Sequence, residues 1–113
     1  RGRGFDRFYG ILSGGGSYYN PNMLMDDLTR ISIDTTDYHV TDAISLKAAQ
    51  FVDDAVHRDR PFFLYMAFTA PHWPLHAWPV DIEKYRGEYL EDWDETRLNR
   101  HESQRGLGVV DRS

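Results

Sequence analysis

An uninterrupted apolar run dominates the pattern of hydrophobic and polar positions along the chain. The seven residues from Phe62 to Phe68 are all apolar or aromatic. A surface strand alternates apolar and polar side chains, so this run predicts a strand buried on both faces or, alternatively, a short buried helix. Pro61 before the run, Pro71 after it and its aromatic content favour the strand.

The residues before this run have the spacing of an amphipathic helix, predicted over Asp42 to His57. Thr41 or Asp42 is suited to cap its start, and His57 places a cation near its end. A helix, a short link and a strand buried on both faces form half of a crossover unit, which predicts a parallel sheet. The apolar stripe of this helix consists of Ile44, Ala48, Phe51 and Ala55, widened by Val52 and Val56.

The predicted strand ends where prolines begin. Pro71 and Pro74 lack a backbone donor, so the strand stops near Ala70 and His72 follows just beyond its carboxyl end. In open α/β sheets, ligands bind at that edge. The pattern therefore makes His72 a candidate functional residue, although a histidine in a proline-rich loop is also typical of a turn residue or a packed ring.

The remaining predicted elements are shorter. A brief strand is expected within residues 5–10, and residues 23–25 and 31–33 are interpreted as a hairpin with a polar tip. Pro79 predicts one or two helical turns over residues 79–85. Asp92 or Asp94 is suited to cap a charged helix that runs to Arg105. Helices and strands together predict an α/β fold.

Composition narrows the class of protein. The 113 residues suffice for one domain, and 41% hydrophobic with 14% aromatic content is typical of a globular chain. A net charge of −5 without a basic stripe argues against nucleic-acid binding. The absence of cysteine excludes disulfides and Cys-based zinc sites. No stretch is long enough for a membrane span, and the compartment (periplasmic, secreted or cytoplasmic) stays open.

Three further features are candidate ligand sites, and each also has an ordinary structural interpretation. The glycine-rich stretch 13–17 can form an anion nest or simply a loop. Asp26 and Asp27 suit Ca²⁺ or Mg²⁺, but aspartates are also common at turn tips. His72 and His76 have the i, i+4 spacing of zinc ligands, yet Pro74 lies between them and no third ligand is evident. We therefore predict no metal ligand in this chain.

The chain resembles type I sulfatases of the arylsulfatase group over nearly its whole length. The most specific element of the resemblance is Ala70-Pro71-His72-Trp73-Pro74-Leu75. Weaker support comes from residues 4–10, 13–15, 38–42, 61–65, 84–87 and 105–108. The opening at Arg1 rather than Met, and a possible new segment at Val109 to Ser113, favour an internal piece of a longer chain. Residues 1–113 are thus expected to be an internal fragment of a sulfatase catalytic domain.

The resemblance implies a fold of the alkaline-phosphatase type, with a large mixed sheet between helices. It implies hydrolysis of a small-molecule or glycan sulfate ester by a formylglycine nucleophile, made from Cys or Ser in a C/S-x-P-x-R motif. It further implies a calcium ion, and a Lys and a His in a Gly-Lys-x-His motif. Neither motif occurs in this chain. We therefore expect the fragment alone to be inactive, with calcium and formylglycine contributed by the remainder of the catalytic domain.

Only one functional residue is carried over from the family, His72, which in relatives contacts the sulfate and the leaving-group side. A fixed N–H donor stabilises the charge that develops as a sulfate ester breaks, and a histidine also transfers a proton near neutral pH. His72 is thus predicted to be catalytic and substrate-binding. Trp73 and His76 are predicted to wall the pocket, with packing as the alternative for Trp73.

Two other functions compete with the sulfatase interpretation. A phosphodiesterase or phosphonate hydrolase of the same superfamily would use similar architecture on a different bond. A non-catalytic module that binds a sulfated sugar would explain the missing nucleophile, with aromatic side chains stacking on sugar rings. The candidate stacking residues are Tyr18, Tyr19, Trp73 and Trp78.

Overall fold

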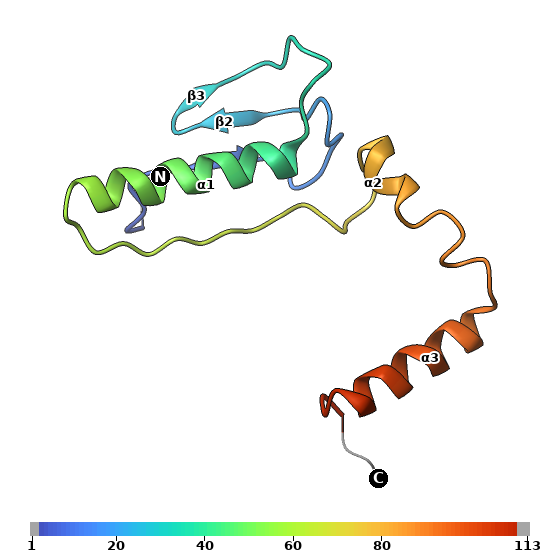
Figure 1. Cartoon of the computed structure of the whole chain (residues 1–113). Coiled ribbons are helices and arrows are strands. Elements are labelled where there is room, and N and C mark those ends of the chain that lie inside the picture. The colour runs from blue at the N-terminus through green and yellow to red at the C-terminus, as the bar shows by residue number, and fades with distance from the viewer. Residues whose placement is uncertain (1–2, 111–113) are drawn as a thin grey trace. The chain divides into compact units, whose positions relative to one another are not determined.

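The computed structural model describes residues 3–110, which form two compact units divided after His76 (Figure 1). The first unit contains the strands β1 (Tyr9–Ile11), β2 (Leu24–Asp26) and β3 (Thr29–Arg30) and the helix α1 (Val40–His57). The second contains α2 (Pro79–Glu83) and α3 (Trp93–Gly106). The class is therefore α/β, as predicted. Most of the segment suspected at Val109 to Ser113 lies outside the described residues.

The sheet is antiparallel throughout, with strand order β1-β2-β3, so the predicted parallel sheet is wrong for the described residues. The hairpin is confirmed, but its second strand, β3, lies at residues 29–30 and not at the predicted residues 31–33, so its tip is shorter than predicted. Asp26 pairs with Thr29, which leaves only Asp27 and Leu28 in the turn. Asp27 adopts a positive φ of 54°, a conformation that aspartate tolerates better than most residues.

Helix α1 begins two residues before its predicted start and ends at His57 as expected. Neither Thr41 nor Asp42 is the N-cap; that position is His39, whose side chain makes no capping hydrogen bond. The predicted stripe faces inward, since Ala48 is buried and Ile44, Phe51 and Ala55 are half-buried. Helix α1 packs against β1, and the core within residues 3–110 contains the buried side chains of Tyr18, Leu24, Val40 and Ala48.

The apolar run Phe62–Phe68 is the clearest departure from prediction. Residues 60–69 run without regular secondary structure and form no ladder with a strand in the described part of the chain (Figure 1). Phe63 is 79% exposed and Tyr65 is 72% exposed. A strand is buried only where neighbours supply hydrogen bonds and cover both faces, and residues 3–110 supply neither for this run.

The second unit agrees with the sequence. Pro79 lies in the first turn of α2, as its position predicted. Helix α3 begins after its N-cap residue Asp92 and ends at Gly106, and both helices are without buried residues. None of the helices among residues 3–110 combines the length and apolarity that a membrane span requires.

Candidate functional site

The loop that follows the apolar run, residues 69–76, carries all three predicted site residues. Two local hydrogen bonds shape it: the His72 amide donates to the Thr69 carbonyl at 2.9 Å, and the His76 amide donates to the Pro74 carbonyl at 2.9 Å. The Ala70–Pro71 and Trp73–Pro74 peptide bonds are cis. The prolines thus end the extended run and begin a compact turn at the position that the sequence predicted.

The side chain of His72 is exposed, and its ring orientation is set by the backbone of the next residue, Trp73. Nδ1 lies 2.6 Å from the carbonyl oxygen of Trp73. A carbonyl only accepts, so Nδ1 carries a hydrogen and donates it. Nε2 is then the ring nitrogen left to act on a ligand: it accepts when the ring is neutral and donates when the ring is protonated. That division of roles suits a residue that delivers a proton or an N–H to an anionic oxygen.

Tyr18 holds this loop from a distant part of the sequence. Its side chain is 1% exposed, and its hydroxyl donates a 2.6 Å hydrogen bond to the carbonyl of His72. Its own amide donates to Nδ1 of His76 at 3.2 Å. Its carbonyl accepts from the amide of Val40, the first residue of α1, at 2.8 Å. One residue therefore connects the centre and the far end of the loop to the start of the long helix.

His39 completes an aromatic cluster beneath the loop, composed of Tyr18, Tyr19, His39 and His76. His39 is 7% exposed, and its Nε2 lies 3.4 Å from the carbonyl oxygen of His76. Both histidine rings meet Tyr18 edge-on, at centroid separations of 5.5 Å for His39 and 5.6 Å for His76. Tyr19 contacts the same two rings at 5.3 and 5.1 Å. The four rings of this cluster pack together, and with their polar contacts they support the loop.

The three predicted site residues therefore occupy different environments. His72 is exposed and Trp73 is 75% exposed, so both are accessible to a ligand. His76 is half-buried, and its Nδ1 is occupied by the Tyr18 amide. Tyr18 is buried, which removes it from the residues proposed to stack on a sugar. The structure brings His72 and His76 onto one loop and assigns them different contacts.

The contribution of His39 and the anchoring role of Tyr18 were not predicted from the sequence. His39 precedes α1 directly, but nothing in its neighbourhood indicates that it meets residue 76. The only local signal is a pair of adjacent tyrosines, Tyr18 and Tyr19, followed by a proline at position 21. A tyrosine pair after a glycine-rich stretch is compatible with a packed loop, and its partners depend on the tertiary structure.

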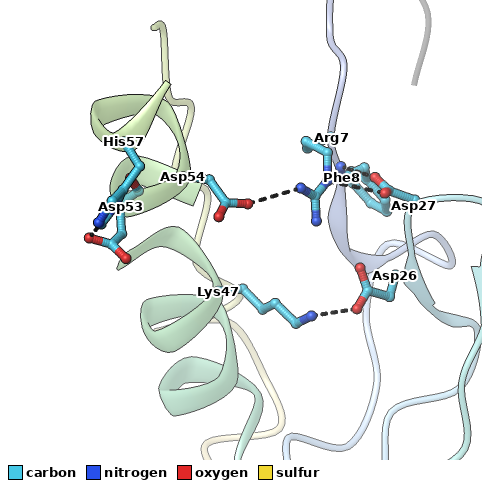
Figure 2. Close-up of polar contacts among 8 residues, drawn as sticks. All are labelled: Arg7, Phe8, Asp26, Asp27, Lys47, Asp53, Asp54 and His57. Atoms are coloured by element: carbon cyan, nitrogen blue, oxygen red, sulfur yellow. Dashed lines mark hydrogen bonds and ion pairs between the residues drawn. The ribbon is translucent and has the colours of Figure 1, made fainter. Parts of the chain in front are cut away.

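The carboxylates Asp26 and Asp27 form ion pairs (Figure 2). Lys47 on α1 contacts Asp26 at 2.5 Å, and Arg7 contacts Asp27 at 3.1 Å and Asp54 at 3.4 Å. Asp27 also accepts the amide of Phe8 at 2.9 Å. These pairs link α1 to the hairpin and to the segment before β1.

The residues of this chain do not fit the calcium ion or the formylglycine that the resemblance implies. Within residues 3–110, no three His, Asp or Glu side chains come together as a metal site. The adjacent pair Asp26 and Asp27 is neutralised by Lys47 and Arg7. The sequence contains no cysteine and no serine in the C/S-x-P-x-R pattern. No step of chemistry is therefore assigned here to either group.

Comparison with known proteins identifies the family. The sequence model of the family described as Sulfatase matches residues 1–113. An uncharacterised sulfatase of Schizosaccharomyces pombe is 34% identical over 122 residues, covering 96% of this chain and 22% of that protein. An arylsulfatase of Klebsiella aerogenes is 26% identical over 119 residues, covering 96% of this chain and 25% of that protein. Arylsulfatase J of Mus musculus is 35% identical over 95 residues, covering 74% of this chain and 16% of that protein.

The chain belongs to the sulfatase family, as its resemblance to arylsulfatases predicted. It spans a quarter or less of the length of these curated relatives. The loop that carries His72 between two prolines therefore belongs to a protein of a hydrolase family. Named members of that family include arylsulfatases.

Proposed function

We propose that residues 1–113 form part of the catalytic domain of a sulfatase that hydrolyses sulfate esters, and that His72 is the residue of this segment that contacts the sulfate group. The observation that carries the proposal is the orientation of the His72 ring. Its Nδ1 is held by the Trp73 carbonyl, while its side chain is exposed at the end of the apolar run. Membership of the sulfatase family supplies the substrate class.

His72 has two tasks in this proposal. A sulfate ester carries negative charge on its non-bridging oxygens, and more charge develops on the leaving oxygen as the S–O bond breaks. An imidazolium Nε2–H placed against that oxygen stabilises the charge and supplies the proton that the leaving group needs. The 2.6 Å contact between Nδ1 and the Trp73 carbonyl keeps Nδ1 away from the substrate, so that Nε2 is the nitrogen presented to it.

Trp73 and His76 have supporting roles in the same proposal. The exposed indole of Trp73 forms one wall of the substrate pocket. His76 anchors the loop through Nδ1 and closes the pocket on its inner side. The nucleophile, the calcium site and the strands that cover Phe62–Phe68 belong to the remainder of the catalytic domain, so the 113 residues alone hydrolyse no sulfate ester.

The test is His72→Ala in the complete protein that carries this chain, assayed with 4-nitrophenyl sulfate. We expect kcat to fall by about two to four orders of magnitude, the usual contribution of general acid–base catalysis. His57→Ala is the matched control, because His57 is an exposed histidine on α1 whose ring contacts Asp53. Unchanged turnover in His72→Ala would refute the assignment. A panel that includes phosphate diesters and phosphonates separates the proposed activity from its superfamily alternative.

The exposed indole of Trp73 is the observation that favours a second function, a module that binds a sulfated sugar without cleaving it. Burial of Tyr18 weakens this alternative, since one of its four stacking candidates cannot reach a ligand. Calorimetric titration of the 113-residue chain with a sulfated glycan tests it directly. Binding that is lost in Trp73→Ala would support the module, and no heat of binding would eliminate it.

A further inference from the structure

We infer that Tyr18 is a positioning residue for His72, an inference that rests on the proposed function of the His72 loop. Tyr18 lies 54 positions before His72 and outside the Ala70–Leu75 motif. With 1% of its surface exposed, it is not accessible to a substrate. It therefore acts on the reaction through the loop that it holds.

The hydroxyl of Tyr18 holds the centre of the loop. It donates to the His72 carbonyl at 2.6 Å, while the His72 amide is engaged by the Thr69 carbonyl at 2.9 Å. The backbone of His72 is thus held on both sides of its Cα atom, and the Trp73 carbonyl fixes the ring. Because Tyr18 is buried, this part-buried hydrogen bond is partly protected from competition with water, so it orders the loop more than a fully exposed one would.

The backbone of Tyr18 holds the far end of the same loop. Its amide donates to Nδ1 of His76, and its carbonyl accepts from Val40 at the start of α1. The Nδ1 atom must be unprotonated to accept, so the neutral His76 ring carries its hydrogen on Nε2. Displacing the loop relative to α1 would break at least one of these two contacts. Tyr18 therefore connects the position of His72 to the helix that packs on the sheet.

Removal of the hydroxyl alone isolates this effect. Tyr18→Phe keeps the ring that packs edge-on against His39 and His76, and deletes only the donor to His72. A catalytic group that moves by about 1 Å can lose up to roughly a hundredfold in rate. We expect kcat to fall by about ten- to a hundredfold while KM changes little, because the remaining substrate contacts are kept.

The experiment is a double-mutant cycle in the complete protein with 4-nitrophenyl sulfate. It compares wild type, Tyr18→Phe, His72→Ala and the double variant. If Tyr18 acts through His72, Tyr18→Phe lowers kcat in the wild-type background and has no further effect once His72 is alanine. Tyr9→Phe is the matched control, because it also deletes a part-buried hydroxyl contact, the 3.2 Å one with Tyr38. It should leave kcat unchanged.

Rescue at His76 gives a second readout should Tyr18→Phe fail to fold. His76→Ala removes the acceptor for the Tyr18 amide, whereas the side-chain oxygen of His76→Asn can accept in place of Nδ1. We expect His76→Asn to recover most of the kcat that His76→Ala loses, and both effects to vanish in the His72→Ala background.

The outcomes separate this inference from the proposed function. If His72→Ala lowers kcat but Tyr18→Phe does not, the inference is wrong and the proposed function stands. If Tyr18→Phe lowers kcat equally in both backgrounds, Tyr18 supports the fold rather than His72, and the inference is again wrong. If His72→Ala leaves kcat unchanged, the proposed function itself fails.

Discussion

Phe63 provides a test of whether the apolar run is buried in the complete protein, since the substitution Phe63→Lys should have a small effect on the stability of the 113-residue chain and a large one on that of the complete protein. In the 113-residue chain Phe63 is 79% exposed, and its ring contacts that of Phe5 at a centroid distance of 6.1 Å. In the complete protein we propose that neighbouring strands cover the run on both faces. The same lysine would then be solvated in the first case and buried in the second.

The magnitudes differ accordingly. In the chain, the loss is at most the tilted ring pair with Phe5, worth about 0.5–1.5 kcal/mol. In the complete protein, removing a buried phenylalanine costs about 3–5 kcal/mol. An unpaired buried ammonium adds several kcal/mol more, which together approaches the roughly 5–15 kcal/mol that stabilises a whole domain. Phe63→Lys should therefore prevent the complete protein from folding.

Two measurements test this reasoning. Sedimentation velocity of the 113-residue chain should show concentration-dependent association that Phe63→Lys reduces, because an exposed apolar run promotes self-association. In the complete protein, Phe63→Lys should yield no soluble folded protein, whereas the control Phe63→Leu should fold. Soluble yield and thermal unfolding measure this difference. A complete protein that carries Phe63→Lys with wild-type stability would refute burial of the run.

Two further predictions concern the first unit. Lys47→Met should lower the free energy of unfolding by about 1 kcal/mol, because the pair with Asp26 is largely shielded from water. Lys84→Met in the second unit, which breaks a solvent-exposed pair, should leave the urea unfolding midpoint essentially unchanged, and equal losses in the two variants would contradict this. Burial and the hydrogen bond between the hydroxyls of Tyr38 and Tyr9 raise the pKa of Tyr38, so the folded state holds that proton more tightly than the unfolded state does. The resulting stability is complete below pH 10.0 and is lost as the pH rises above it, so Tyr38→Phe should flatten the alkaline fall in the urea midpoint, and an unchanged fall would contradict this.

The position of the His72 loop could be predicted because its causes are local. Pro71 and Pro74 cannot continue a strand, so the run had to end just before His72 whatever surrounds it. The contacts that anchor the loop could not be predicted, because they join residues far apart in the sequence. His39 and Tyr18 contact His76 across 37 and 58 positions, respectively. No periodicity or spacing in the chain encodes those contacts.

By itself the sequence determined the helices, the turn after the apolar run and the family. Helix α1 follows from a periodic apolar stripe, and α3 from its Asp92 start and glycine end, because helical hydrogen bonds join residues four apart. Only the tertiary structure decided the antiparallel pairing, the exposure of Phe62–Phe68 and the anchoring of His72 by Tyr18. Strand pairing and burial depend on which distant segments come into contact. An apolar run in the sequence indicates that other segments cover it, but it does not indicate which segments these are.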